Sequence, residues 1–172
     1  MTPRQLRWML TVLGGLALAR GGASIFSRPE QEVLYAAYTL PPTCLSSGCI
    51  TIYTLTVGNT GTEDQEQVRV RLHDSGLQAA VLPPTVRTFG KVERPFAMSE
   101  DAGVRTYALG RLRPGDRVEL SFALRTASPA AAPPWDAILA GVDPARGTAR
   151  AGDPAAVSLG RLLYTVFGVR WW

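Results

Sequence analysis

A chain of 172 residues and 18.5 kDa has room for one ordinary domain and short extensions. Hydrophobic residues make up 46% and charged residues 19%, proportions typical of a globular protein rather than a disordered or fibrous one. A single histidine, His73, and two cysteines disfavour a His-based metal site, a His-containing catalytic triad and an iron–sulfur cluster. We therefore predict a protein that is not an enzyme and that uses no cofactor or metal ion.

The first thirty residues predict either an export signal or a membrane anchor. Arg4 and Arg7 precede an uncharged run, WMLTVLGGLALA at 8–19, in the order of the basic and apolar regions of a secretory signal peptide. Small residues just before Arg20 offer a cleavage site. The alternative, which we favour, is an uncleaved anchor, because the run from Trp8 to Phe26 approaches the ~20 residues of a spanning helix if Arg20 reaches the outer interface.

Both interpretations export the rest of the chain, so we expect it on the periplasmic side of the inner membrane of a bacterial-type cell envelope. Cys44 and Cys49 flank a turn-prone Leu-Ser-Ser-Gly tetrapeptide. In an oxidising compartment such a pair forms a local disulfide, whereas a metal site would need two more soft ligands. We predict the disulfide Cys44–Cys49, with two free thiols as the alternative.

From residue 32 onward the hydrophobic pattern has a period of two, which indicates β-strands. The pattern is clearest at 50–57, 68–72 and 118–124. Further strands are predicted at 33–38, 77–82, 86–89, 104–109 and 137–142. Roughly seven or eight short strands, separated by turn signals and without an intervening helical pattern, predict an all-β antiparallel β-sandwich. We place this domain at 31–158, between a segment at 1–30 and a tail at 159–172.

Two motifs on these strands carry a family resemblance. The stretch from Ile50 to Leu72, ITIYTLTVGNTGTEDQEQVRVRL, resembles the opening of bacterial immunoglobulin-like surface domains, including cell-adhesion-related domains with a Y-t-l-t-V-x-N-t-G strand and turn. The segment LGRLRPGD at 109–116, followed by alternating apolar residues, resembles the L-x-P-G-[DE] hairpin of the same families. The resemblance spans about residues 40–142 and implies an immunoglobulin-like fold that serves as a binding, spacer or assembly module. A single copy between two hydrophobic ends argues against a long adhesin stalk.

The C-terminal tail at 159–172, LGRLLYTVFGVRWW, is apolar but too short to span a bilayer. It is either the last strand of the sandwich or a docking tail, since tryptophan and arginine are favoured at membrane and protein interfaces. Membrane or partner contacts are assigned to Trp8, Arg20, Arg161, Leu162, Leu163, Val166, Phe167, Arg170, Trp171 and Trp172.

Arginines inside the domain predict contacts with an acidic partner or anionic headgroups. Arg69 and Arg71 lie on the exposed side of a predicted strand, while Arg111, Arg113 and Arg117 surround a hairpin turn. The acidic run EDQE at 63–66 is expected to be a solvated loop rather than a weak Ca²⁺ site. The Pro- and Ala-rich stretch at 127–135 is expected to be a loop that turns its tryptophan toward a partner.

These features predict a non-enzymatic accessory subunit, anchored in the membrane, that binds and stabilises a larger membrane protein complex of respiratory, photosynthetic or secretion type. Its expected partners are the subunits of that complex and, through the N-terminal helix, the lipid bilayer. Nucleic acid is disfavoured by export and by the lack of an aromatic and basic platform, and we expect no small-molecule substrate. The competing hypothesis is a free-standing periplasmic or cell-surface binding or adhesion module for a protein or a glycan.

Overall fold

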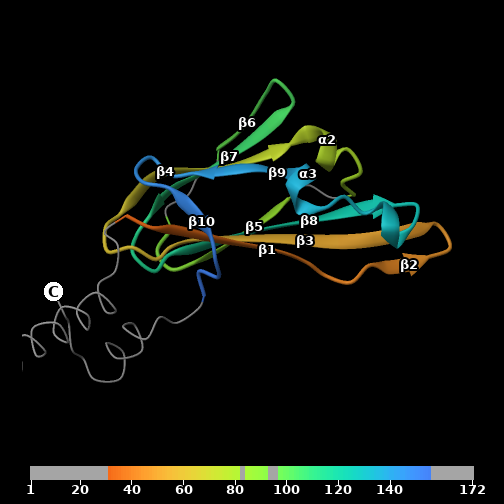
Figure 1. Ribbon diagram of the computed structural model, residues 1–172, viewed down its shortest axis with the longest axis horizontal. Helices are drawn as coiled ribbons and strands as arrows, with labels where there is room; N and C mark the ends of the chain where they lie inside the picture. Colours follow the sequence, from red (N-terminus) through yellow and green to blue (C-terminus); the bar gives the residue numbers. More distant parts are fainter. Residues whose placement is uncertain (1–30, 82–83, 93–96, 156–172) are drawn as a thin grey trace, which may run out of the picture. The chain divides into compact units, whose positions relative to one another are not determined.

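Strands that alternate apolar and polar side chains bury one face and leave the other in water, so they need a second layer to pack against. The computed structural model describes residues 31–81, 84–92 and 97–155, and in this part the chain forms two sheets, seen as two layers in Figure 1. The strands are β1 (Val33–Thr39), β2 (Thr43–Leu45), β3 (Gly48–Asn59), β4 (Gln65–His73), β5 (Thr85–Phe89), β6 (Ala97–Asp101), β7 (Val104–Leu112), β8 (Arg117–Thr126), β9 (Leu139–Asp143) and β10 (Ala149–Ala151), and the short helices are α2 (Asp74–Leu77), η1 (Pro129–Ala131) and α3 (Trp135–Ile138). The all-β class is confirmed.

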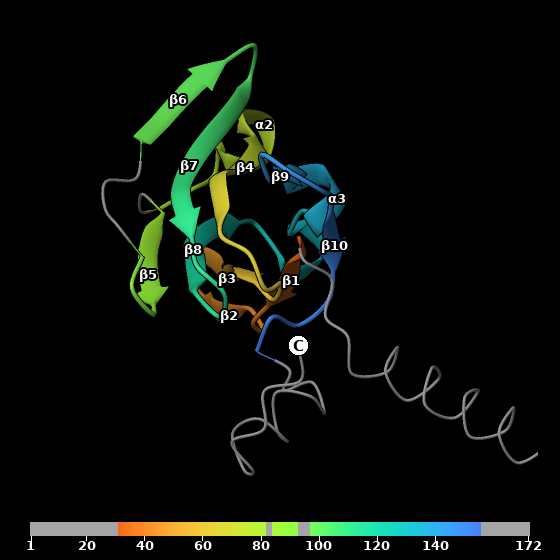
Figure 2. The same ribbon diagram turned by 90° about the vertical axis from the view of Figure 1, so that its left-hand side faces the viewer.

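A six-stranded sheet has the order β10-β1-β3-β8-β5, with β2 also paired to β3, and a four-stranded sheet has the order β6-β7-β4-β9. Figure 2 shows the two layers end-on. All pairs are antiparallel except β1 with β10, which run parallel with Val33 opposite Ala149. The prediction of a wholly antiparallel domain is therefore wrong at this pair. After β9, which belongs to the other sheet, the chain crosses back and starts β10 beside the first residue of β1, so the two strands run in the same direction.

The core lies between the two sheets and is built from every second residue of the long strands. In β3 the inward side chains are Tyr53, Leu55 and Val57, which are buried, while Thr56 points outward and is partly exposed. The same alternation places three side chains of β4 and four of β8 in the core. These are Val68, Val70, Leu72, Val118, Leu120, Phe122 and Leu124. Removing this apolar surface from water is the main force that holds the sheets together.

Local patterns misplace some elements. Of the predicted strand at 77–82, Leu77 instead ends α2, residues 78–81 form a single bridge, Ala80 to Leu124, and residue 82 lies outside the described residues. The predicted strand at 137–142 begins with α3 and becomes β9 at Leu139. The strands β2, β6 and β10 were not expected from the pattern, because they are short and have little buried surface.

The disulfide Cys44–Cys49 is confirmed, and it joins directly opposite positions of the β2–β3 hairpin. The stretch at 127–135 differs from the expectation, because its tryptophan turns inward instead of toward a partner. The Trp135 ring packs edge-on against Tyr53 and Phe122, with centroids 5.5 Å and 5.9 Å away. The Tyr53 hydroxyl donates to the carbonyl of Pro133 at 2.7 Å, and burial raises the pKa of this hydroxyl above its ordinary value.

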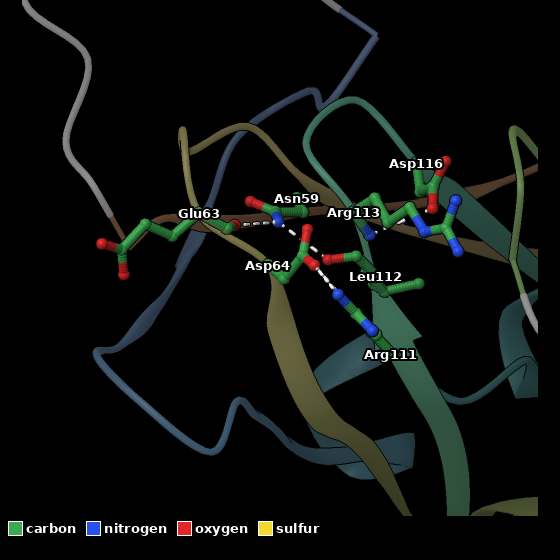
Figure 3. A network of polar contacts seen from close by, with 7 residues as sticks. All are labelled: Asn59, Glu63, Asp64, Arg111, Leu112, Arg113 and Asp116. Atoms are coloured by element: carbon green, nitrogen blue, oxygen red, sulfur yellow. Dashed lines mark hydrogen bonds and ion pairs between the residues drawn. The ribbon is translucent and has the colours of Figure 1, made fainter.

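The two turn motifs that carry the family resemblance meet at one end of the fold (Figure 3). The buried Asn59 side chain donates to the carbonyls of Glu63 and Leu112, at 2.6 Å and 2.9 Å, and accepts from the Gly61 N–H at 3.0 Å. The neighbouring Asp116 carboxylate accepts from the backbone N–H of Arg113 at 3.0 Å. The polar residues of both motifs therefore satisfy buried backbone groups, which is a structural role.

No helix in the described ranges is long and apolar enough to cross a bilayer. The predicted anchor at 1–30 and tail at 159–172 lie outside those ranges, so the residues assigned to membrane or partner contacts there stay predictions. The domain boundaries at 31 and 158 stay predictions as well.

Candidate functional site

The predicted arginines do not come together on one surface. Arg69 and Arg71 point outward from β4 on the four-stranded sheet. Arg71 forms an ion pair with Asp143 of β9, with Nε–Oδ2 2.5 Å and Nη2–Oδ1 3.3 Å. Arg111 likewise forms an ion pair with Asp64, and its Nε lies 2.9 Å from Oδ2 (Figure 3). Two of the predicted cations are thus neutralised within the chain.

Arg117 lies on the other sheet, at the start of β8, and points outward beside an aromatic ring. Its guanidinium carbon is 5.2 Å from the centroid of Phe89, which lies directly opposite it on β5. Arg87, two residues before Phe89 on the same strand face, places its guanidinium carbon 6.0 Å from the same centroid. We call Arg87 and Arg117 the basic pair. Arg87 was not singled out from the sequence, although the alternation in TVRTF already puts it on the same side as the phenylalanine.

A row of exposed apolar side chains crosses the outer face of this six-stranded sheet. Leu40 lies opposite Ile52, joined by the Leu40 N–H to Ile52 carbonyl bond of 2.9 Å, and Ile52 lies opposite Ala123 of β8. Val81 continues the row, because its N–H bonds to the Ala123 carbonyl at 2.9 Å. Tyr38 adjoins the row on the same face of β1, two residues before Leu40.

The disulfide-bonded hairpin extends this surface at one end of the sheet. Leu45 lies opposite Gly48 at the end of β2, next to the tip of the hairpin, and 65% of its surface is exposed. The Cys44–Cys49 bond crosses the hairpin one residue pair away and limits its movement. We call the row, together with Leu45 on the same face, the apolar strip. It consists of Tyr38, Leu40, Leu45, Ile52, Val81 and Ala123.

Single exposed apolar residues are common on protein surfaces, but contiguous ones mark interaction sites. Four members of the apolar strip are large residues with 41–46% of their surface exposed, and they lie on neighbouring backbone segments. They are Tyr38, Leu40, Ile52 and Val81. Such a surface offers docking energy and shape rather than chemistry on a substrate.

The remaining candidates from the sequence have structural roles. Asp74, beside His73, forms an ion pair with Arg105 at 2.5 Å. In the acidic run, Asp64 pairs with Arg111 and Glu63 accepts a hydrogen bond from Gln31 at 3.3 Å. Within the described part of the chain, no three His, Cys, Asp or Glu side chains gather in a way that could hold a metal ion.

No family model matches the sequence, and no curated protein matches it either. The resemblance to bacterial immunoglobulin-like domains therefore stays a prediction that rests on the two turn motifs. The outer face of the six-stranded sheet, with its apolar strip and basic pair, is the best-defined candidate site among the described residues.

Proposed function

We propose that the protein is a non-enzymatic accessory subunit that binds and stabilises a larger membrane protein complex through the apolar strip. The observation that carries the proposal is the contiguity of Leu40, Ile52, Ala123 and Val81 across four neighbouring backbone segments. Their outward direction follows from the register, because the alternate residues of the same strands fill the core. A partner that covers the strip would remove this apolar surface from water.

The energy available from the strip is modest, and a membrane anchor would make it sufficient. Fully burying one large apolar side chain contributes ~1.5–3 kcal/mol, so burying the exposed part of a half-buried one contributes about 1 kcal/mol. Four such residues supply about 4 kcal/mol before the cost of association, which corresponds to weak binding in free solution. The predicted anchor at 1–30 raises the effective concentration of the partner in the same membrane, and the predicted docking tail would add contacts of its own.

The proposed location is the periplasmic side of the inner membrane. The disulfide supports it, because such bonds form and persist in oxidising compartments and are rare in the cytosol. The order of basic and apolar residues near the N-terminus supports export as well.

We also infer that the fold is immunoglobulin-like, which fits a binding or assembly module. In that fold two antiparallel sheets are connected by a chain that crosses repeatedly from one to the other. Here consecutive strands change sheet from β3 to β4, β4 to β5, β5 to β6, β7 to β8, β8 to β9 and β9 to β10, which supports the inference.

Ile52→Glu tests the proposed function, because it places a charge in the middle of the strip without touching the core. Full-length protein is extracted from its native membranes with a mild detergent and separated by size. We expect the natural chain to migrate with a large assembly and the Ile52→Glu chain to migrate alone. Met98→Glu is the matched control, since Met98 is also exposed, at 60%, but lies on β6 of the other sheet. Migration of the natural chain as an 18.5 kDa species would instead support the free-standing binding module.

A further inference from the structure

Among the described residues, the outer face of the six-stranded sheet carries more positive than negative charge. The strand register directs Arg87, Arg117, Arg125 and Arg150 outward on this face, against a single acidic residue, Glu119. No carboxylate oxygen of the described residues lies within 4.0 Å of any of these four guanidinium groups. On the four-stranded sheet, by contrast, Arg71 is paired with Asp143.

The basic pair holds two like charges close to one ring. Arg87 and Arg117 both lie within 6.0 Å of the Phe89 centroid, at a distance where a cation is attracted to an aromatic face. Glu119 lies directly opposite Arg87 on β8, so its carboxylate offsets one of the two charges. The positive charge that remains favours an anionic group bound from outside the sheet.

The backbone beneath the basic pair is fixed, so the two arginine side chains leave the sheet at defined positions. Phe89 pairs with Arg117 at the end of the β5–β8 ladder. Just beyond it, the Lys91 N–H donates to the buried Asp116 carboxylate at 3.0 Å, which ties the end of β5 to the turn before β8. Planar guanidinium groups in fixed positions bind carboxylates through two parallel hydrogen bonds.

We propose that the partner protein presents carboxylate side chains to Arg87 and Arg117 while its apolar residues cover the apolar strip. This inference rests on the proposed function and adds the chemistry of the partner surface, which is acidic beside apolar. Arg117 and Ala123 are six residues apart on β8, so the two parts of the surface are separated by about 20 Å. This length fits one side of a protein–protein interface of standard size, about 800 Å².

A protein partner fits this face better than an anionic lipid surface. Between the apolar strip and the basic pair lies a polar band in which the hydroxyls of Thr54 and Ser121 are hydrogen-bonded at 3.1 Å. The outward Glu119 belongs to the same band, and a bilayer would bury its carboxylate in the same apolar layer as the strip, at the cost of desolvating it. A protein surface can match apolar, polar and basic parts separately.

Zero-length coupling with a water-soluble carbodiimide tests the proposal, because it joins an amine only to a carboxylate that touches it. Lys91 is the single lysine of the chain, so Lys91→Arg gives a background with no lysine side chain, and Glu119→Gln removes the neighbouring carboxylate on the same face. Arg117→Lys is then the probe, and Arg69→Lys on the four-stranded sheet is the matched control. Both variants are treated in native membranes.

We expect Arg117→Lys to give a covalent adduct, mapped by mass spectrometry from position 117 to an Asp or Glu of a membrane complex protein, at least tenfold above Arg69→Lys. We also expect Arg87→Glu combined with Arg117→Glu to reduce the co-migrating protein at least tenfold. If both variants still co-migrate with the assembly but give equal adducts, or none, this inference is overturned and the proposed function stands. If the natural chain does not co-migrate, the proposed function itself fails.

A lipid surface is the remaining outcome and is measured separately. The full chain is reconstituted in vesicles of phosphatidylcholine alone or with phosphatidylglycerol, and hydrogen exchange is followed in β5. Protection of β5 by phosphatidylglycerol that disappears in the Arg87→Glu, Arg117→Glu chain overturns the proposal in favour of lipid. Equal exchange in the two vesicle types supports a protein partner.

Discussion

Replacement of Asn59 by alanine is the sharpest test of how the fold is held together. The Asn59 side chain makes three hydrogen bonds to backbone groups of three other residues, Gly61, Glu63 and Leu112. It sits where the turn after β3 meets the end of β7, and alanine keeps the backbone of β3 intact while it removes all three bonds. The substitution therefore isolates the side chain's contribution to joining the two sheets.

The expected loss of stability depends on whether each backbone group has another partner once the Asn59 side chain is removed. Glu63 is exposed, so water can replace its lost partner, and the Gly61 N–H keeps a second acceptor, the Glu32 carbonyl at 3.2 Å. The Leu112 carbonyl is buried and loses the amide donor of Asn59. A buried backbone group that loses its partner costs ~1–3 kcal/mol, so the substitution should cost about 2 kcal/mol. That is a sizeable part of the ~5–15 kcal/mol that stabilises an ordinary domain. The melting temperature should fall by roughly 7 °C.

The free energy of unfolding is measured by urea denaturation of the full-length chain in mild detergent, followed by circular dichroism. Thr60→Ala is the control, because the Thr60 hydroxyl makes one bond, to the Glu32 carboxylate at 2.8 Å, and its loss should cost about 1 kcal/mol. If Asn59→Ala costs no more than Thr60→Ala, the turn network does not join the two sheets and the structural role given to the motif is wrong.

Two further predictions concern the other turn and the tail. Gly90→Ala should destabilise the fold by about 3 kcal/mol, because Gly90 has φ +105° and an added Cβ would lie 2.0 Å from Asp116 Oδ1. Gly103→Ala is the control, because Gly103 has φ +76° but no atom within 4 Å of an added Cβ, and it should cost about 1 kcal/mol. Thermal melts of the two variants measure both losses of stability. Deletion of Gly168–Trp172 should leave the melting temperature nearly unchanged and release the subunit from its complex. A fall in melting temperature would make the tail the closing strand, and a stable deletion variant that still co-purifies in full amount would exclude docking.

The long strands and the disulfide could be predicted from the sequence because their signals are local. In ITIYTLTV at 50–57, Tyr53, Leu55 and Val57 alternate with threonines, which predicts that these three side chains face the core. The register of β3 against β8 places them there. The cysteines are close in sequence, so one hairpin turn brings them together. The strand β10 has no such local signal. Its three residues pair with β1 because the folding of the other strands leaves one edge of β1 open beside them.

The candidate site could not be predicted because it depends on which strands share a sheet. Arg71 and Arg117 have similar local patterns, because Arg71 lies between the inward Val70 and Leu72 and Arg117 is followed by the inward Val118. Only the pairing of β4 with β9 gives Arg71 its carboxylate, and only the pairing of β8 with β5 puts Arg117 beside Phe89. The same holds for the apolar strip, whose members come from segments far apart in the sequence.

The charge beside the apolar strip also bears on specificity. An exposed apolar row on a sheet face can also bind a second copy of the same chain, since covering the row removes apolar surface from water. Two copies of this face stacked with their basic pairs in register would oppose Arg87 and Arg117 of one to the same residues of the other, and like charges at an interface cost several kcal/mol. An acidic partner meets the same arginines with opposite charge and gains where the second copy loses. Under the proposed function, the basic pair would therefore favour an acidic partner over a second copy in that orientation, which is how binding surfaces combine attraction to one partner with repulsion of another.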